Sequence, residues 1–519
     1  MTHIRSSVGT GPRVSRKSGG ARRARAAAAL LAAGGLSAWA LAATPAFAAT
    51  GHPAQSPSAA SAKAAKGQAA KTDDFNGDGY ADVVAGAPGG TVSGKATAGY
   101  VVVTYGSASG LSPAHKSILS RSTSGVPGTA AAKEQFGSAF SKGDLDGDGY
   151  SDLVIGSGKA GLSSVILWGS PTGLTGGTEI KGYGQTPTVG DFDGDGKADL
   201  ALFGDPGSYG DDPPAQPAAL WKGPVSRTTG QPAGKLNFLD KSEWWGYDDN
   251  GAACADDDSC INGPHSVAGP VIAKATGDVN GDGREDIVAG VYDGDGMWQN
   301  HVLLGSPDGF THATTEGYGG AVGVGDVDGD GYDDVVVGAN DATSKVTIDF
   351  GSADYPKQDR EQTFDQTLPG FYGAQEKGDD VGSCVSVADV TGDGKADVLL
   401  GISGEDFSGL TNAGSFALLH GTSTGVTGSG SQVVHQNTAG VPGVAETGDK
   451  FGAACTLADT NGDGHRDIAV SSSAENDSAG ALWSFNGTAS GLTTTGATAF
   501  GPADLGATAT KALFGSTLR

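Results

Sequence analysis

DVDGDGYDD at residues 326–334 decides the fold, because close copies of this nine-residue loop recur along the chain. The other copies begin at Asp74, Asp144, Asp191, Asp278, Asp389 and Asp459. Oxygen-bearing side chains occupy loop positions 1, 3, 5 and 9, the kind of spacing that a hard cation such as Ca²⁺ requires in a tight loop. Position 6 is Gly in each copy, as expected where the chain turns sharply with a positive φ. The pattern predicts seven Ca²⁺ loops.

Position 7 is Tyr, Lys, Arg or His, which suits a residue that contributes only its backbone carbonyl to a metal. We expect the side chain of His465, which occupies this variable position, to point to solvent. We therefore expect up to seven Ca²⁺ ions and no other cofactor. The predicted metal ligands are Asp74, Asn76, Asp78, Tyr80, Asp82, Asp144, Asp146, Asp148, Tyr150, Asp152, Asp191, Asp193, Asp195, Lys197, Asp199, Asp278, Asn280, Asp282, Arg284, Asp286, Asp326, Asp328, Asp330, Tyr332, Asp334, Asp389, Thr391, Asp393, Lys395, Asp397, Asp459, Asn461, Asp463, His465 and Asp467.

These loops differ from an EF-hand, which needs a bidentate Glu at position 12 and a helix on either side. Position 12 is instead apolar: Ala85, Ile155, Leu202, Ala289, Val337, Leu400 and Val470. Short apolar runs follow the loops, such as VVVG at residues 335–338, and such runs are typical of buried strands. Ordinary Asp-Gly turns without metal are the alternative, but turn chemistry explains the Gly and not the four oxygen positions.

The spacing between loops varies from 47 to 87 residues, which indicates a constant unit with variable insertions. Each unit contains four strand-like pieces, and four antiparallel strands repeated seven times predict an all-β fold, a seven-bladed β-propeller. Only a linker-like segment precedes the first loop, whereas LFGSTLR at residues 513–519 has the form of the strand before a loop. We therefore expect the C-terminal strand to complete the first blade and close the ring.

The repeats resemble the FG-GAP repeats of integrin α-subunit propellers and of their secreted bacterial relatives. Phe136-Gly137, Phe451-Gly452 and Phe514-Gly515 supply the FG element, and Gly86-Ala87-Pro88 supplies the GAP element. The resemblance covers residues 72–519 and implies a propeller whose loops bind Ca²⁺. Integrin propellers carry such loops in only some blades, whereas all seven are intact here. The legs and membrane helix of an integrin subunit have no counterpart, so adhesion signalling is not implied.

The N-terminal region predicts export. A basic segment is followed by an apolar stretch at residues 26–43 and by Ala46-Phe47-Ala48, so we expect a signal peptide of residues 1–48, cleaved after Ala48. Residues 49–71 predict a disordered linker, and residues 72–519 the propeller, with an insertion at 224–270 between the third and fourth blades. No later stretch is long enough to span a membrane. We expect a secreted monomer.

Cleavage removes seven positive charges, which takes the formal net charge from −26 to −33. This acidity argues against nucleic acids and anionic membranes as partners. Of the four cysteines, Cys254 and Cys260 bracket a short acidic segment and are predicted to pair. Cys384 and Cys455 lie in equivalent strands one position out of register, so they face opposite ways and are predicted to bridge neighbouring blades, with two free thiols as the alternative.

No catalytic constellation is evident. Gly421-Thr-Ser-Thr-Gly425 matches a nucleophile elbow, but it aligns with turns such as GSPTG at residues 169–173 and is interpreted as a repeat turn. The favoured function is a binding or adhesion scaffold for an extracellular protein or glycan. An extracellular hydrolase or lyase is the alternative, because related repeats occur in some lyases and phospholipases. A lectin is a third hypothesis. Trp244 and Trp245 in the insertion offer a ligand platform or simply pack it against the propeller.

Overall fold

The computed structural model describes residues 73–159, 161–207, 210–211, 213–239, 262–339, 345–355 and 360–519. The predicted signal peptide, the predicted linker and the predicted Cys254–Cys260 pair lie outside these residues. So do Trp244 and Trp245 of the insertion. The side chains at 313–318, which lie in the strand Gly309–Tyr318, are also outside the description.

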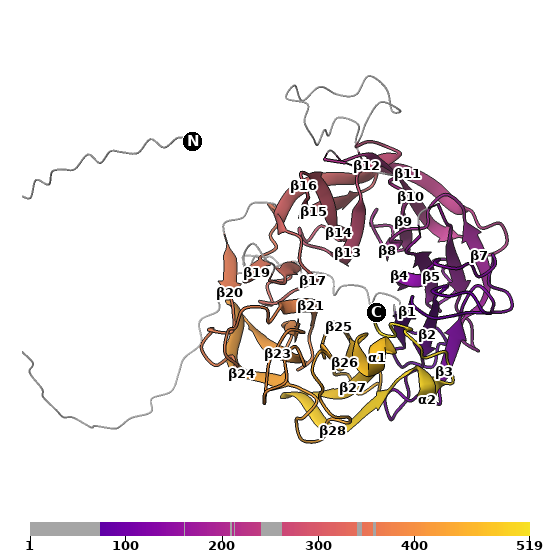
Figure 1. Ribbon diagram of the computed structural model, residues 1–519. Coiled ribbons are helices and arrows are strands. Elements are labelled where there is room, and N and C mark those ends of the chain that lie inside the picture. The colour runs from indigo at the N-terminus through magenta and orange to yellow at the C-terminus, as the bar shows by residue number, and fades with distance from the viewer. Residues whose placement is uncertain are drawn as a thin grey trace, which may run out of the picture. The chain divides into compact units, whose positions relative to one another are not determined.

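Antiparallel sheets built from consecutive strands make up the fold (Figure 1). A three-stranded sheet contains β1 (Val83–Ala87), β2 (Tyr100–Thr104) and β3 (Lys116–Leu119). Four-stranded sheets contain β4 (Phe136–Gly143), β5 (Asp152–Ser157), β6 (Ser164–Trp168) and β7 (Thr175–Ile180); β17 (Val322–Gly325), β18 (Asp334–Val337), β19 (Val346–Asp349) and β20 (Glu361–Phe364); β21 (Val381–Ala388), β22 (Asp397–Ile402), β23 (Ser415–Thr422) and β24 (Gly425–Val434); and β25 (Ala454–Ala458), β26 (Asp467–Ser472), β27 (Ala481–Thr488) and β28 (Gly491–Phe500).

A nine-stranded sheet joins two antiparallel runs of this kind. Its strands are β8 (Thr188–Gly190), β9 (Asp199–Phe203), β10 (Ala215–Val225), β11 (Pro232–Leu239), β12 (Ser266–Ala268), β13 (Val271–Gly277), β14 (Asp286–Gly294), β15 (Met297–Ser306) and β16 (Gly309–Tyr318). The last strands of the two runs, β11 and β16, pair in parallel. The hydrogen-bonded ladders of the described residues therefore form six sheets, and the count of seven blades stays a prediction.

The apolar runs after the acidic loops form buried strands, as the sequence predicts. These strands are β1, β5, β9, β14, β18, β22 and β26, each the second strand of its unit or, for β1, the first of its sheet. Residues of β5, for instance, are buried along the whole strand. β-branched and other apolar side chains at every position suit a strand that is covered on both faces.

Each sheet is covered because it packs against both of its neighbours in the ring. In β1, Val84 packs with Phe136 and Ile155 of the following sheet. The next residue, Ala85, packs with Leu482 of the last sheet in the chain. Successive residues of a strand point to opposite faces, so one strand serves both interfaces. The sheets accordingly close into a ring, as Figure 1 shows for this part of the chain.

The C-terminal segment closes the ring at β1, which confirms the sequence prediction. Ala85 and Leu518 form an antiparallel bridge. The N–H of Val84 donates to the carbonyl of Arg519 at 2.9 Å, and the N–H of Arg519 donates back to Val84 at 3.1 Å. Phe514 is fully buried in the same interface. The last residues of the chain thus pair, through this bridge and these hydrogen bonds, with the otherwise open inner edge of the first sheet.

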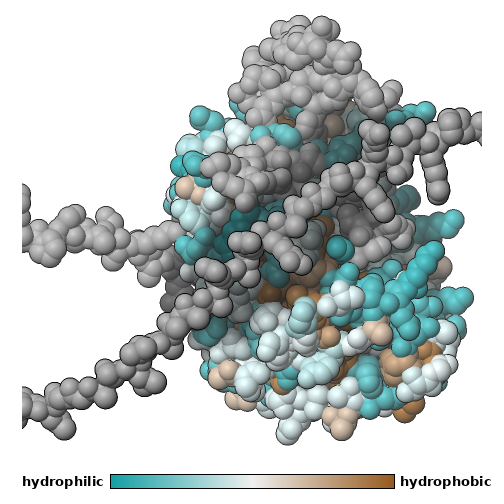
Figure 2. All heavy atoms as spheres, turned by 90° about the vertical axis from the view of Figure 1, so that its left-hand side faces the viewer, coloured by the Kyte–Doolittle hydropathy of each residue, from teal (hydrophilic) through white to brown (hydrophobic). Residues whose placement is uncertain are grey.

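Helices contribute little to the described residues. Two one-turn helices, α1 (Glu475–Ser478) and α2 (Pro502–Leu505), lie near the end of the chain. No described helix has the length and apolar character needed to cross a membrane. On the face that Figure 2 shows, the coloured surface is mostly hydrophilic, with smaller hydrophobic areas between.

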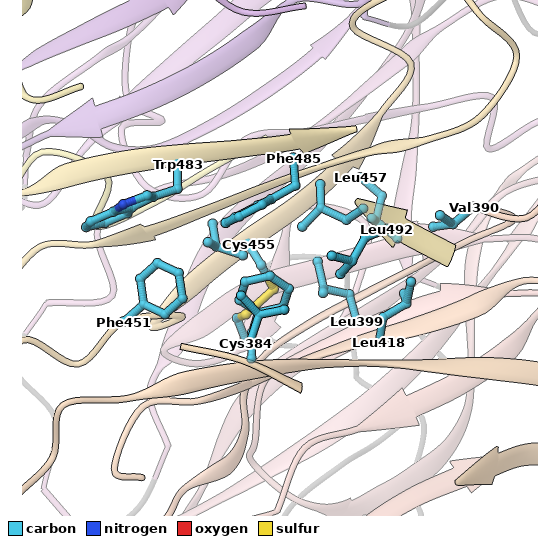
Figure 3. Packing of buried hydrophobic residues seen from close by; sticks show 14 of the residues in the cluster. Cys384, Val390, Leu399, Leu418, Phe451, Cys455, Leu457, Trp483, Phe485 and Leu492 are labelled. Atoms are coloured by element: carbon cyan, nitrogen blue, oxygen red, sulfur yellow. A yellow bond between two sulfur atoms is a disulfide. The ribbon is translucent and has the colours of Figure 1, made fainter. Parts of the chain in front are cut away.

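Cys384 of β21 and Cys455 of β25 form a disulfide that joins two neighbouring sheets, with a Cα–Cα distance of 5.9 Å. This confirms the predicted bridge between blades. The disulfide is buried in an apolar cluster that includes Phe451 and Trp483, whose rings are perpendicular with centroids 4.9 Å apart (Figure 3). The bond therefore links two sheets whose shared interface is already a packed core.

We predict that replacing Cys384 and Cys455 together by Ala lowers the free energy of unfolding by about 2–4 kcal/mol, because the bridge restrains a long segment of the unfolded chain. Urea denaturation at fixed Ca²⁺ measures the difference from the wild type. A change below about 0.5 kcal/mol, the range of a neutral surface substitution, would contradict this prediction.

Candidate metal centres

The aspartate at position 1 organises each acidic loop. In the Asp74 loop its Oδ1 accepts hydrogen bonds from the N–H groups of Gly77 and Asp78 at 2.6 and 3.2 Å. Its Oδ2 accepts from the N–H of Gly79 at 2.8 Å. Equivalent contacts fix Asp144, Asp326, Asp389 and Asp459. This carboxylate is held inside the loop by the backbone that surrounds it.

The side chains at positions 3 and 5 also accept hydrogen bonds from backbone N–H groups of the loop, but each accepts fewer than the side chain at position 1. In the Asp326 loop, the Oδ1 of Asp328 accepts from the N–H of Asp330 at 3.1 Å. The Oδ1 of Asp330 accepts in turn from the N–H of Tyr332 at 3.0 Å. Short polar side chains that accept from a backbone N–H two residues later are favoured in turns. The loop sequence thus specifies its own conformation locally.

The aspartate at position 9 connects the loop to the sheet. Asp152 is fully buried; its Oδ2 accepts from the N–H of Leu145 in the loop, and its Oδ1 accepts from the N–H of Gly169 after β6, at 2.9 and 2.8 Å. The glycines that make the second contact elsewhere are Gly106, Gly223, Gly305, Gly351, Gly421 and Gly487. Sequence reasoning missed these donors, although each Gly lies near the end of the third strand of its unit or just after it.

Burial raises the pKa of the position-9 carboxyl groups of Asp82, Asp152, Asp199, Asp286, Asp334 and Asp467, because removal from water disfavours the charged form. The pKa rises to about 6 for Asp199, about 7 for Asp82, and about 8 for Asp152, Asp286 and Asp334. Neighbouring loop aspartates raise it further in each case, while the backbone N–H donors lower it. A cation bound beside these carboxylates would therefore stabilise their charged form.

Three loops bring carboxylate oxygens close enough to share one ion. In each, one oxygen from position 1, 3 and 9 lies within 4.8 Å of the others: Asp144, Asp146 and Asp152; Asp191, Asp193 and Asp199; and Asp326, Asp328 and Asp334. Oδ1 of Asp191 is buried without a hydrogen-bond partner. Oxygen donors gathered in this way suit a hard cation such as Ca²⁺, which takes six to eight oxygens. The donor set fits the predicted ion.

The other four loops have an amide or hydroxyl at position 3. Asn76 and Asn280 donate to the position-5 carboxylates Asp78 and Asp282, at 2.9 and 3.3 Å. The amide of Asn461 lies 3.2 Å from Oδ1 of Asp467, the carboxylate at position 9. Their position-1 carboxylates accept backbone hydrogen bonds of the same pattern, as in the Asp278 loop, where Asp278 accepts from the N–H groups of Asp282 and Gly283. Metal binding at all seven loops stays a prediction.

Position 7 has a role that the sequence analysis missed. A side chain placed on Gly77 of one loop would collide with the ring of Tyr150 in the next loop. The same collision occurs between Gly281 and Tyr332. Because position 7 is variable, the sequence predicts that the side chain of His465 points to solvent. Its Nδ1 instead lies 3.0 Å from the carbonyl oxygen of Val390 in the preceding loop. That expectation is wrong, because side chains at position 7 cover the neighbouring loop.

Backbone hydrogen bonds join neighbouring loops. The N–H of Ser151 donates to the carbonyl of Asp74 in the preceding loop at 2.9 Å. The N–H of Ala81 in the first loop donates to the carbonyl of Asp459 in the last loop, also at 2.9 Å. Equivalent bonds join Glu285 to Asp191, Asp333 to Asp278 and Ala396 to Asp326. The acidic loops are thus linked along one rim of the ring.

Gly421–Gly425, the string that resembles a nucleophile elbow, connects β23 and β24 in a hairpin turn. Oγ1 of Thr422 donates to the carbonyl of Gly425 at 2.6 Å. Ser107, Ser170, Ser306 and Thr488 make the same contact in other units. This recurrence supports its interpretation as a repeat turn.

Comparison with known proteins agrees with this architecture. The FG-GAP repeat family matches residues 67–104, 318–349, 381–419 and 451–485, and the FG-GAP-like repeat family matches residues 144–202. These segments therefore match FG-GAP repeats, which are typical of β-propellers.

Two curated relatives share part of this region. Integrin alpha pat-2 of Caenorhabditis briggsae is 39% identical over 107 residues, 20% of this chain and 8% of the relative. Phosphatidylinositol-glycan-specific phospholipase D of Rattus norvegicus is 35% identical over 97 residues, 19% of this chain and 11% of the relative. The chain thus spans only a small part of the length of the curated relatives it matches.

Solved structures align weakly. The Tc holotoxin pore of Photorhabdus luminescens aligns over 75% of this chain and 17% of that chain, with a TM-score of 0.32 and 14% identity. A mutant of AofleA from Arthrobotrys oligospora aligns over 71% of this chain and 88% of that chain, with a TM-score of 0.34 and 10% identity. Neither likeness bears on function.

The raised pKa of buried position-9 carboxyl groups such as Asp334 predicts an unusual pH dependence in metal-free buffer. A folded-state pKa near 8 for Asp334, against 3.8 for the free side chain, means that the folded protein binds more protons than the unfolded chain between these values. Stability then falls as pH rises through this window. We expect the melting temperature in chelator-treated buffer to be higher at pH 5 than at pH 8.

Millimolar Ca²⁺ is the control, because a bound ion compensates the charged form and should flatten or reverse the trend. Replacing Asp334 by Asn should reduce the slope, since one titrating group is lost. A metal-free melting temperature that rises between pH 5 and pH 8 would show that the buried carboxylates do not control stability.

Proposed function

We propose that the protein is a secreted, Ca²⁺-stabilised FG-GAP propeller that acts as a binding or adhesion scaffold for an extracellular protein or glycan. The observation that carries the calcium part is the convergence of carboxylate oxygens within 4.8 Å of one another in three loops. The FG-GAP repeats and the partial match to an integrin alpha chain support a binding role. The disulfide between Cys384 and Cys455 suits an exported protein.

Ca²⁺ would be held by the oxygens at positions 1, 3, 5 and 9 and by the carbonyl at position 7 of each loop. The ion supplies positive charge where acidic side chains otherwise repel one another. The protein's own residues then have two tasks. Backbone N–H groups aim the position-1 carboxylate inward, and the position-9 carboxylate ties the loop to the glycine after the third strand. A loaded loop therefore holds three strands of its unit in place.

We expect Ca²⁺ removal to lower the melting temperature by many degrees. Extracellular Ca²⁺ modules typically bind at roughly 10⁻⁴ to 10⁻³ M, and an ion at tenfold excess over its Kd adds about 1.4 kcal/mol per site. Calorimetry in EDTA and in millimolar Ca²⁺, with elemental analysis of the purified protein, measures the effect and the stoichiometry.

Asp148→Ala removes one position-5 ligand and should lower the number of bound ions by one. Asp308→Ala is the matched control, because Asp308 is an exposed residue in a hairpin turn outside the acidic loops. Unchanged melting in EDTA, together with no calcium in the purified protein, would overturn the calcium part of the proposal.

We expect binding to the extracellular partner to need the folded, Ca²⁺-loaded propeller. Screening on a glycan array and on immobilised extracellular matrix proteins, each with Ca²⁺ and with EDTA, identifies the partner class. A hit that is lost in EDTA and restored by Ca²⁺ supports the scaffold. Turnover of a glycan or phospholipid substrate without stable binding would favour the enzyme alternative instead.

A further inference from the structure

In three acidic loops, a Lys or Arg side chain from outside the loop contacts the carboxylate at position 3. A fourth loop, which has Thr391 at position 3, meets His420 instead, whose Nδ1 lies 3.1 Å from Oδ1 of Asp397 at position 9. Arg227 hydrogen-bonds to Asp146, and its Nη2 lies 2.7 Å from Oδ2 of Asp148 and 3.6 Å from Oδ1 of Asp152. These aspartates occupy positions 3, 5 and 9 of the Asp144 loop, so the guanidinium reaches the carboxylates that are predicted to hold Ca²⁺. The other two clusters receive a cation in the same way.

In the Asp191 loop the cation is Lys222. Its Nζ contacts Oδ2 of Asp193 and lies 2.9 Å from Oδ2 of Asp195. In the Asp326 loop, Nη1 of Arg360 contacts Oδ2 of Asp328. Each basic group thus meets the aspartate at position 3.

Position 3 is what distinguishes these three loops from the other four. It is Asp in the loops that begin at Asp144, Asp191 and Asp326, and Asn or Thr in the other loops. An Asp adds one negative charge at the centre of the cluster, and the basic side chain offsets it. Basic side chains at position 7 contact the position-5 carboxylate in loops of both kinds, as Lys197, Arg284 and Lys395 do. Apart from these, four carboxylates with one Lys or Arg from outside the loop carry the same formal charge as three carboxylates with a neutral amide or hydroxyl. The basic side chain therefore matches the extra carboxylate.

The three cations come from different places in the fold. Lys222 lies in β10 directly before Gly223, whose N–H binds Asp199 of the same loop. Arg227 follows β10 and reaches across to the loop of the preceding unit. Arg360 directly precedes β20. These three positions are not equivalent in the repeat. What the three loops share is therefore the positive charge beside the position-3 carboxylate, and not a common place in the fold from which it comes.

Two of the cations are also supported by an aromatic ring. The guanidinium carbon of Arg227 lies 5.4 Å from the centroid of the Trp168 ring, and that of Arg360 lies 3.8 Å from the centroid of the Phe350 ring. Yet none of the three is sealed in: the side chains of Lys222, Arg227 and Arg360 are 32%, 31% and 43% exposed. A long side chain with its end group partly in water can swing away from its partner.

The geometry points to Lys222, Arg227 and Arg360 as built-in counter-cations that offset one negative charge of each of the three four-carboxylate loops without metal and must move aside when Ca²⁺ enters them. This inference rests on the proposed function, because it assumes that the loops bind Ca²⁺. A bound ion and the basic group need the same oxygens, since both address the position-3 carboxylate. The basic residue therefore stabilises the empty loop and weakens its affinity for the ion.

Lys222→Met tests the inference, because it keeps the aliphatic stem and removes the charge. Two opposite changes are expected: the melting temperature in chelator falls relative to the wild type, and Ca²⁺ affinity at one site rises roughly three- to tenfold, as loss of a competing ion pair implies. Chelator-competition titration and calorimetry measure both. A purely structural role of Lys222 would lower stability and would not raise affinity. Binding of one additional ion also supports the inference.

Matched variants separate the effect of the missing charge beside Asp193 from the general effect of removing a lysine. Asp193→Asn combined with Lys222→Met recreates the neutral position 3 of the other loops and should restore metal-free stability. Lys181→Met is the control, because the Lys181 side chain is 81% exposed and lies outside the acidic loops. Should Lys222→Met not fold in chelator, it is purified in Ca²⁺ and titrated with chelator, and Arg360→Gln provides a second measurement.

The outcomes distinguish the two proposals. If the wild type binds Ca²⁺ and neither Lys222→Met nor Arg360→Gln changes affinity or stoichiometry, the counter-cation inference is wrong and the proposed function stands. If neither the wild type nor any variant binds Ca²⁺, the proposed function has failed, and the inference fails with it.

Discussion

A buried carboxylate at the end of each acidic loop ties the loop to its sheet, and the rest of the structure depends on this contact. Asp152 shows the arrangement: one oxygen accepts from the loop and the other from the glycine after the third strand of the unit. Desolvation makes the charged form costly unless donors or a cation compensate it. This one carboxylate therefore joins three elements: the loop, the strand that follows the loop and the next strand of the sheet.

These units are joined at two levels. Apolar strands pack on both neighbours, so Val84 and Ala85 of one strand belong to two different interfaces. Along the rim, N–H groups of each linked loop bond to the carbonyls of the loop before it, including Ala81 to Asp459 across the closure. Neighbouring units share these interfaces and hydrogen bonds. A change in the charge of one loop therefore also affects the stability of the units beside it. The proposed Ca²⁺ ions and the packing of the strands would therefore stabilise the same ring.

Much of the architecture followed from local patterns. The nine-residue loops specify their own turns because the acceptors and the backbone donors are only two to five residues apart. The register of Cys384 and Cys455 predicted their bridge, since opposite strand faces meet between neighbouring sheets. The prediction for His465 was wrong. The variability of loop position 7 indicated a side chain that points to solvent, whereas the imidazole contacts a backbone carbonyl of another loop. Variable side chains can still pack when the surface they cover is backbone.

The sequence by itself determined the repeat, the acidic loops, the buried strands and the closure of the ring, because each depends on residues close together in the chain or on a pattern that recurs. Only the tertiary structure decided which cations meet which loops. Lys222 and Arg227 lie five residues apart yet reach different loops, and nothing in their local sequence indicates this. Long side chains find their partners in space, and those distances are set by how whole sheets pack.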